Sequence, residues 1–338
     1  MRRLLFLVIL CFSLFGCQQQ PDTVQLRGAT MGTTWSVNLH SIPGSIDPAI
    51  LKQQLQQRLD LVNRLMSTYD PASEISRFNN VSSTDWFPIS AETAEVVALS
   101  LQISELTGGA LDISVGPLVE LWGFGAKERE QLPTDEQVAA QLAKIGYQQL
   151  ELREHPPSIR KHHPQLQIDL SAVAKGYAVD LLAKDLAQLG INNFLVEVGG
   201  ELQISGQRSD GTPWRVAVEK PEEAVREVAR IFPLSATALA TSGNYRNFYV
   251  ENGQRYVHTI DPVSGRPIRH QLASATVLAI DCARADALAT ALMVLGEEKG
   301  RQLVEQQGIA AYFLIHQKET FSEYHSPAFQ AFIEKGQP

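Results

Sequence analysis

Helix-like and strand-like segments follow one another irregularly along this chain, and their order restricts the possible architectures more than any other feature. Apolar residues at helical spacing predict helices over residues 48–66, 91–107, 134–145, 172–189, the segment around 286–290, and 297–307. Alternating or short apolar runs predict strands at 28–40, 167–169, 194–198, 202–205, 214–218, 231–239, 247–250, 256–260, 273–279 and 310–316. Because helices do not separate the strands regularly, we expect an α+β fold with mixed or antiparallel sheets rather than a doubly wound parallel sheet.

The first residues have the form of an export signal. Arg2 and Arg3 precede an apolar run over residues 4–15, which is shorter than the roughly 20 residues needed to span a bilayer. The run ends in Leu-Phe-Gly-Cys, which resembles a bacterial lipobox. We therefore expect a lipoprotein signal at residues 1–16 and a lipid on Cys17. An ordinary signal peptide with a chance cysteine is the alternative.

The lipobox predicts attachment to a membrane through a lipid, but this signal alone leaves open which membrane. Residues 17–27 are expected to form a polar tether, and residues 28–335 a single domain. We expect a lipid anchor on the periplasmic side of the cell inner membrane. Gln18 follows the expected lipid site, whereas Asp at that position favours inner-membrane retention, so the outer membrane stays an alternative.

Cysteine usage and net charge exclude some classes of protein. Of the three cysteines, Cys11 lies in the signal and Cys17 is the expected lipid site, so only Cys282 remains and no intramolecular disulfide framework is expected. The formal net charge is −8. This argues against a nucleic-acid-binding protein, which would carry clustered basic residues.

Asp286 and Thr290 lie four residues apart in the apolar segment ADALATALM. Four residues is about one helical turn, so both side chains face the same way. Hard oxygen ligands at one site suit Mg²⁺, which often completes its shell with water and substrate phosphate. The alternative is local: an Asp near a helix start, and a Thr hydroxyl bonded to the carbonyl four residues earlier.

Two further stretches could carry chemistry. Asp169 precedes an expected helix that carries Lys175, and helix N-terminal amides attract anions such as phosphate. The alternative is a simple N-cap with a solvated lysine. His258 precedes an Asp-Pro turn closed by Ser-Gly, which makes it the best placed histidine for a general base.

Three other positions have weaker signals. Met31 lies in the small-residue stretch ATMGTT, which would let a ligand approach the backbone or would simply form a turn. Tyr69, near an Asp-Pro turn, could flank a planar ligand. Asp112 lies in an apolar, strand-like run, where it either satisfies nearby amides or accepts from a ligand.

Taken together, these stretches resemble one family. The sequence contains, in order, ATMGTTW, MSTYDP, SEISRFN, GGALDISVGPLV, LWGFG, DLSAVAKGYAVD, EVGGEL, ATSGNYRNF, HTIDP and ADALATALMVLG. This order, behind a lipobox, resembles the ApbE family of FAD:protein FMN transferases. The resemblance implies a T-fold-like α+β domain that binds FAD and Mg²⁺. It also implies transfer of FMN from FAD to a Thr or Ser hydroxyl of a target protein, with release of AMP.

The resemblance also implies roles for individual residues. His258 would be the catalytic base, with Asp286 as the second catalytic residue. The metal would be held by Asp286, Thr290 and the backbone carbonyl of Ala172. Flavin contacts would come from Met31, Tyr69, Ala110, Leu111, Asp112, Asp169, Lys175 and Ile260. The implied partners are exported subunits of membrane redox complexes, of the sodium-pumping NADH:quinone reductase or Rnf type.

Two other functions remain open on the sequence. Some members of this family hydrolyse FAD to FMN and AMP, which uses the same metal and leaving group. A lipid-anchored FAD-binding protein without catalysis is a further alternative. The flavin follows from the resemblance alone, because no GxGxxG motif follows a strand and opens a helix here.

Overall fold

The computed structural model describes residues 23–125, 131–222, 227–318 and 320–335. Its largest sheet has eight strands, and every neighbouring pair is antiparallel. In sheet order these are β1 (Thr23–Thr30), β2 (Thr33–His40), β6 (Asn193–Val198), β7 (Glu201–Ser205), β10 (Thr237–Gly243), β15 (Leu272–Ala279), β16 (Ala310–Gln317) and β17 (Thr320–His325). The α+β class with antiparallel sheets, predicted from the irregular order of elements, is confirmed.

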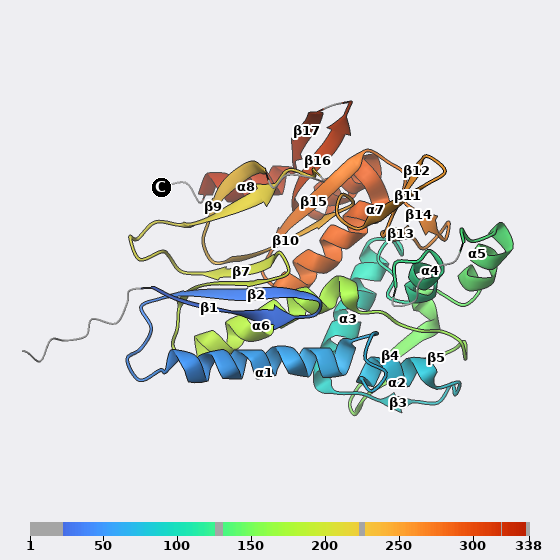
Figure 1. The fold of residues 1–338 in the computed structure, drawn as a ribbon, viewed down its shortest axis with the longest axis horizontal. Coiled ribbons are helices and arrows are strands. Elements are labelled where there is room, and N and C mark those ends of the chain that lie inside the picture. Colours follow the sequence, from blue (N-terminus) through green and yellow to red (C-terminus); the bar gives the residue numbers. More distant parts are fainter. Residues whose placement is uncertain (1–22, 126–130, 223–226, 319, 336–338) are drawn as a thin grey trace, which may run out of the picture.

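Four long helices form the main core with this sheet. Three of them, α1 (Pro48–Met66), α6 (Ser171–Gln188) and α7 (Cys282–Gln307), cover one face of the sheet (Figure 1), and α3 (Ala91–Leu106) packs against α6 and α7. The alternation of the strands explains the two-sided packing. In β16, Phe313 faces the helices, whereas Tyr312 and Leu314 face the opposite layer.

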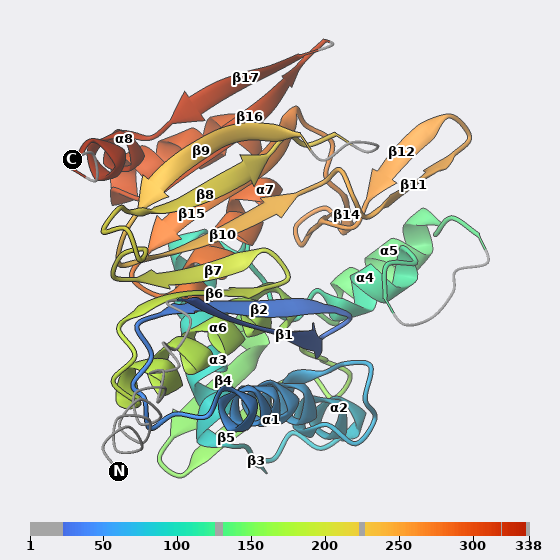
Figure 2. The same cartoon turned by 60° about the vertical axis from the view of Figure 1, so that its left-hand side comes forward.

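The opposite layer is smaller and covers only part of the sheet. It consists of the hairpin β8 (Trp214–Glu219) and β9 (Val228–Leu234) and the terminal helix α8 (Pro327–Lys335). Figure 2 shows β8 and β9 lying over the sheet beside β7 and β10. Among the described residues, no helix has the length and apolar character needed to cross a bilayer.

Short elements gather at one end of the sheet (Figure 2), and some of them line the cavity described below. They are α2 (Glu74–Asn80), α4 (Gly116–Leu121), α5 (Asp135–Leu142), the 3-10 turn η1 (Tyr147–Gln149), and the hairpins β11 (Phe248–Glu251) with β12 (Gln254–Val257) and β13 (Ile260–Asp261) with β14 (Arg266–Pro267). A three-stranded sheet of β3 (Phe87–Pro88), β5 (Pro157–Lys161) and β4 (Leu150–Glu154) lies beside α3.

The N-terminal boundary differs from the expected one. Residues 23–27, expected in the tether, pair with residues 36–40 of β2 and belong to β1. Leu26 alternates inward and is buried, which ties this segment to the core. The folded domain therefore includes residues 23–27, which lie before the expected boundary at residue 28. The signal at 1–16 and Cys17 lie outside the described residues.

Several strand boundaries also differ. The strand expected at 231–239 is two strands, β9 and β10, in different sheets, because Ala236 adopts a left-handed φ of 48° between them. The strand expected at 256–260 is interrupted at residues 258–259. No strand forms at 167–169 or around Asp112. The separate helices expected before and after residue 296 form one element with a break at Gly296.

Candidate active site

A cavity of about 690 Å³ opens at the end of the sheet where the short elements gather, a size typical of ligand pockets. Almost all of the site residues predicted from the sequence line it. These are Tyr69, Ala110, Leu111, Asp112, Asp169, Ala172, Lys175, His258, Ile260, Asp286 and Thr290. The fold thus brings together residues from loops, from the start of α6 and from the middle of α7.

Met31 is the exception among the predicted residues. It occupies the turn between β1 and β2 with a left-handed φ of 48°. Its side chain is partly buried and packs against the main core, and it does not line the cavity. The role of Met31 in flavin binding stays a prediction from the family resemblance.

A close approach of α6 and α7 builds the floor of the cavity. A Cβ atom on Gly176 would lie 2.4 Å from the carbonyl oxygen of Cys282, so only glycine fits there. At this crossing, the Asp286 side chain accepts a hydrogen bond from the backbone N–H of Gly176, at 3.1 Å. Tight backbone packing thus delivers the carboxylate of one helix to the first turns of the other.

Asp286 is almost completely buried, at 2% exposure. Burial raises the pKa of its carboxyl, although Lys175 and the Gly176 amide oppose that rise. One turn further along α7, the Thr290 hydroxyl lies 3.2 Å from the Ser242 hydroxyl of β10. The Thr290 hydroxyl thus bonds with a side chain of the sheet and not with a carbonyl of its own helix.

Lys175 lies between two buried carboxylates. Its Nζ is 3.0 Å from Glu201 Oε1 and 3.5 Å from Asp286 Oδ2. Burial lowers the pKa of Lys175, but Asp286 and Glu201 outweigh that effect and the net shift is upward. Burial raises the pKa of Glu201 to about 7, against the effect of Lys175. Glu201 Oε2 is buried and has no hydrogen-bond partner in the part of the chain that the structure describes.

The donor set fits Mg²⁺. Within the described residues, no three or more His, Cys, Asp or Glu side chains gather as a metal cluster. The Gly176 N–H, which a regular helix would direct to the Ala172 carbonyl, is engaged by Asp286. A carboxylate, a hydroxyl and a carbonyl suit Mg²⁺, which keeps several waters and binds substrate phosphate.

His258 lies between β12 and β13, outside any strand ladder. Its Nδ1 is 3.1 Å from the carbonyl oxygen of Asn247, and its backbone N–H donates to the same oxygen. Burial lowers the pKa of the imidazole, and the nearby Lys175 charge adds to this, whereas the Asn247 contact raises it. The ring is therefore a neutral base near neutral pH.

Two further aspartates that line the cavity form hydrogen bonds within the chain. Asp112, expected in a strand, lies in a turn, where its carboxylate accepts from the backbone N–H groups of Ser114 and Tyr147 and from the Ser114 hydroxyl. Asp169 accepts from the backbone N–H and hydroxyl of Ser171. These carboxylates brace the loops that form the cavity wall.

The family model for the ApbE family matches residues 31–313. The chain belongs to the ApbE family. An FAD:protein FMN transferase of Vibrio cholerae is 43% identical over 323 residues, which cover 95% of this chain and 96% of that protein. One of Escherichia coli K12 is 42% identical over 332 residues, covering 94% and 93%.

Solved ApbE structures share the fold described above. The flavin transferase ApbE from Vibrio cholerae superposes with a TM-score of 0.86 at 43% identity, covering 92% of this chain and 99% of that one. The Pseudomonas stutzeri flavinyl transferase ApbE, in its apo form, gives 0.85 at 37% identity, covering 94% and 98%.

Three residues that shape this ApbE cavity are not singled out by the sequence patterns. Glu201 holds Lys175, and the Asn247 carbonyl orients His258. Asn79 of α2 exchanges two hydrogen bonds with the backbone of Ile168 and thereby fixes the segment before α6. Each of the three lies in a motif that the family resemblance uses: Glu201 in EVGGEL, Asn79 in SEISRFN and Asn247 in ATSGNYRNF. Membership of these motifs is the sequence signal that could have identified them.

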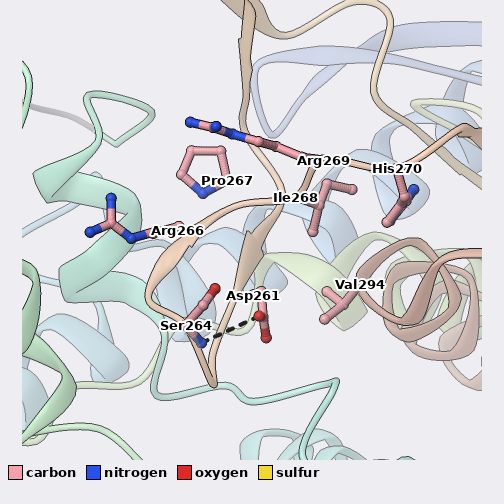
Figure 3. Close-up of a pocket in the computed structure, with 8 residues that line it drawn as sticks. All are labelled: Asp261, Ser264, Arg266, Pro267, Ile268, Arg269, His270 and Val294. Carbon is pink, nitrogen blue, oxygen red and sulfur yellow. Dashed lines mark hydrogen bonds between the residues drawn. The ribbon is translucent and has the colours of Figure 1, made fainter.

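A second hollow of about 490 Å³ borders the main cavity, because Val294 of α7 lines both. Figure 3 shows His270 beside Val294 at one end of this hollow. His270 Nε2 lies 2.7 Å from the carbonyl oxygen of Met293. The imidazole thus caps the first part of α7 just before the break at Gly296.

Proposed function

We propose that this enzyme transfers FMN from FAD to a Thr or Ser hydroxyl of a target protein in a Mg²⁺-dependent reaction that releases AMP. ApbE family membership and relatives named FAD:protein FMN transferase support flavin transfer. The observation that carries the detailed proposal is that a histidine, a carboxylate, a hydroxyl and a helix start all line one cavity.

The chain's own residues perform the acid–base part of the reaction. Nδ1 of His258 donates to the Asn247 carbonyl, which leaves Nε2 as the acceptor for the proton of the incoming hydroxyl. As that proton leaves, the hydroxyl oxygen bonds to the FMN phosphorus. The pyrophosphate bond to AMP breaks, and its electron pair leaves with AMP.

The α6–α7 crossing supplies the electrostatic part. Asp286, Thr290 and the Ala172 carbonyl would hold Mg²⁺, which when bound neutralises pyrophosphate charge. Lys175 adds a positive charge beside the N-terminus of α6, where anions are favoured. Glu201 and Asp286 keep that lysine oriented toward the cavity.

The lipobox supports a location for the activity. In this proposal Cys17 carries the lipid, and the enzyme acts on the periplasmic side of the inner membrane, with the outer membrane as the alternative. Its targets are exported subunits of redox complexes of the NADH:quinone reductase or Rnf type.

One experiment tests the function. The full chain is mixed with FAD and Mg²⁺, with and without an acceptor domain that bears the target hydroxyl, and AMP and the acceptor mass are followed together. AMP together with a gain of one FMN supports transfer. AMP without a mass gain supports FAD hydrolysis, and intact FAD in both tubes supports a binding protein without catalysis.

A further inference from the structure

The first turn of α7 is held by two carboxylates from different places. Asp180 of α6 accepts from the backbone N–H of Cys282 at 2.7 Å through Oδ1, and from that of Ala283 at 2.9 Å through Oδ2. Asp281, the residue before the helix, accepts from the backbone N–H of Arg284 at 2.8 Å. Asp180 thus ties α7 to another helix, whereas Asp281 caps it locally.

Asp180 lies on the same face of α6 as Ala172, whose carbonyl is a proposed metal ligand, and Gly176, which bonds with Asp286. Ala172, Gly176 and Asp180 are spaced by four residues and so form one stripe along the helix. Gly176 bonds with Asp286, and Asp180 bonds with the helix start one turn before Asp286. The two contacts together fix the position of α7 along the axis of α6.

We propose that Asp180 is a positioning residue for the metal site, since it sets where Asp286 lies relative to the Ala172 carbonyl. The inference rests on the magnesium part of the proposed function. Mg²⁺ demands near-ideal octahedral geometry with short ligand distances. A small slide or rotation of α7 would therefore weaken metal binding before it altered the chemistry at a fully loaded site.

The chain offers a matched control. Asp180→Ala removes the two hydrogen bonds that join the helices, whereas Asp281→Ala removes a cap of the same helix without breaking that link. Asp180→Asn keeps one acceptor oxygen but turns an amide N–H toward a backbone N–H. The expected order of metal affinity is wild type equal to Asp281→Ala, then Asp180→Asn, then Asp180→Ala.

Metal binding is read directly with Mn²⁺, by counting the free ion in electron paramagnetic resonance titrations of the full chain. We expect the Asp180 variants to raise the Mn²⁺ dissociation constant about 10- to 100-fold, with folding checked by circular dichroism. In FMN transfer, the KM for Mg²⁺ should rise by a similar factor, while kcat at saturating Mg²⁺ stays close to that of the wild type.

The outcomes separate the inference from the proposed function. Unchanged Mn²⁺ affinity in folded Asp180→Asn overturns the positioning role while the wild type still binds metal. Equal losses of Mn²⁺ affinity in Asp281→Ala and Asp180→Ala also overturn it. Any weakening of the start of α7 would then lower metal affinity, with no special part for the link to α6. A wild type that binds no Mn²⁺ and transfers FMN without metal removes the magnesium proposal, and the inference with it.

Discussion

Nδ1 of His258 lies 3.1 Å from the carbonyl oxygen of Asn247. A carbonyl oxygen only accepts hydrogen bonds, so this contact places the proton of a neutral ring on Nδ1 and leaves Nε2 free to accept. Because the same oxygen also accepts from the His258 backbone N–H, ring and backbone are held together. One peptide carbonyl thus determines which nitrogen can act as the base.

His258→Ala should slow FMN transfer by about 10²- to 10⁴-fold, the usual contribution of a general base. FAD binding should change little, because the side chain acts on the acceptor proton. Flavin fluorescence titration and AMP release measure the two effects. His162→Ala, at an exposed histidine paired with Glu151, is the control and should match the wild type. A loss of FAD binding equal to the loss of rate would contradict the role as base.

The pH dependence of transfer should reflect the lowered pKa of His258. The neutral ring is the active form, so the rate rises as pH rises through this pKa. Because burial and the Lys175 charge move the pKa below 6.5, that rise should lie on the acid side and be complete by neutral pH. The measurement is kcat/KM for the acceptor from pH 5 to pH 9 at saturating Mg²⁺. A rise in rate centred above pH 7 would show that the pKa of the His258 imidazole is not lowered.

Asp286→Asn should remove most activity and most metal affinity, because it removes the carboxylate charge. The neutral amide keeps the side-chain shape and an acceptor for the Gly176 N–H, so the packing of the two helices should be preserved. We expect at least about a tenfold rise in the KM for Mg²⁺.

A pair of variants at Thr290 distinguishes a metal-ligand role of its hydroxyl from a packing role. Thr290→Ser keeps the hydroxyl and should stay active, whereas Thr290→Val keeps the side-chain volume and should lose activity. Equal activities of the two Thr290 variants would exclude the hydroxyl as a ligand.

The sequence predicts the parts of the site that depend on local periodicity. Asp286 and Thr290 share a helix face because the apolar spacing of their segment is helical, and the structure places both in the cavity. The pattern predicts a continuous strand over residues 256–260, with His258 as a base candidate beside the Asp-Pro turn; in the structure His258 lies between two strands and lines the cavity. The local sequence pattern thus identifies the residue, whereas its backbone conformation depends on how the neighbouring strands pair.

Contacts between distant segments could not be read from the pattern. Glu201 and Lys175 meet only because β7 and α6 pack together, and nothing in their own neighbourhoods requires an ion pair. Asp112 gave a strand-like signal from its apolar neighbours, but its carboxylate folds the chain into a turn by bonding with the Ser114 and Tyr147 amides. Side-chain to backbone bonds of this kind compete with strand formation.

Gly176→Ala should destabilise the protein and weaken the metal site together. The added Cβ would lie 2.4 Å from the Cys282 carbonyl oxygen, which is backbone and cannot yield, so α7 must move away from α6. Overpacking of this kind costs about 1–3 kcal/mol, more than the roughly 1 kcal/mol that alanine gains in a helix. Gly300→Ala in α7 is the control, because its Cβ would meet the Phe313 ring at 3.4 Å and Leu292 Cδ2 at 3.5 Å, both ordinary contacts with side chains. Urea unfolding should show a lower free energy of unfolding for Gly176→Ala and an equal or higher one for Gly300→Ala, and Mn²⁺ affinity should fall only in the first. Equal free energies of unfolding for the two variants would mean that α6 and α7 pack less tightly at Gly176 than the geometry indicates. The position of Asp286 would then not depend on this crossing.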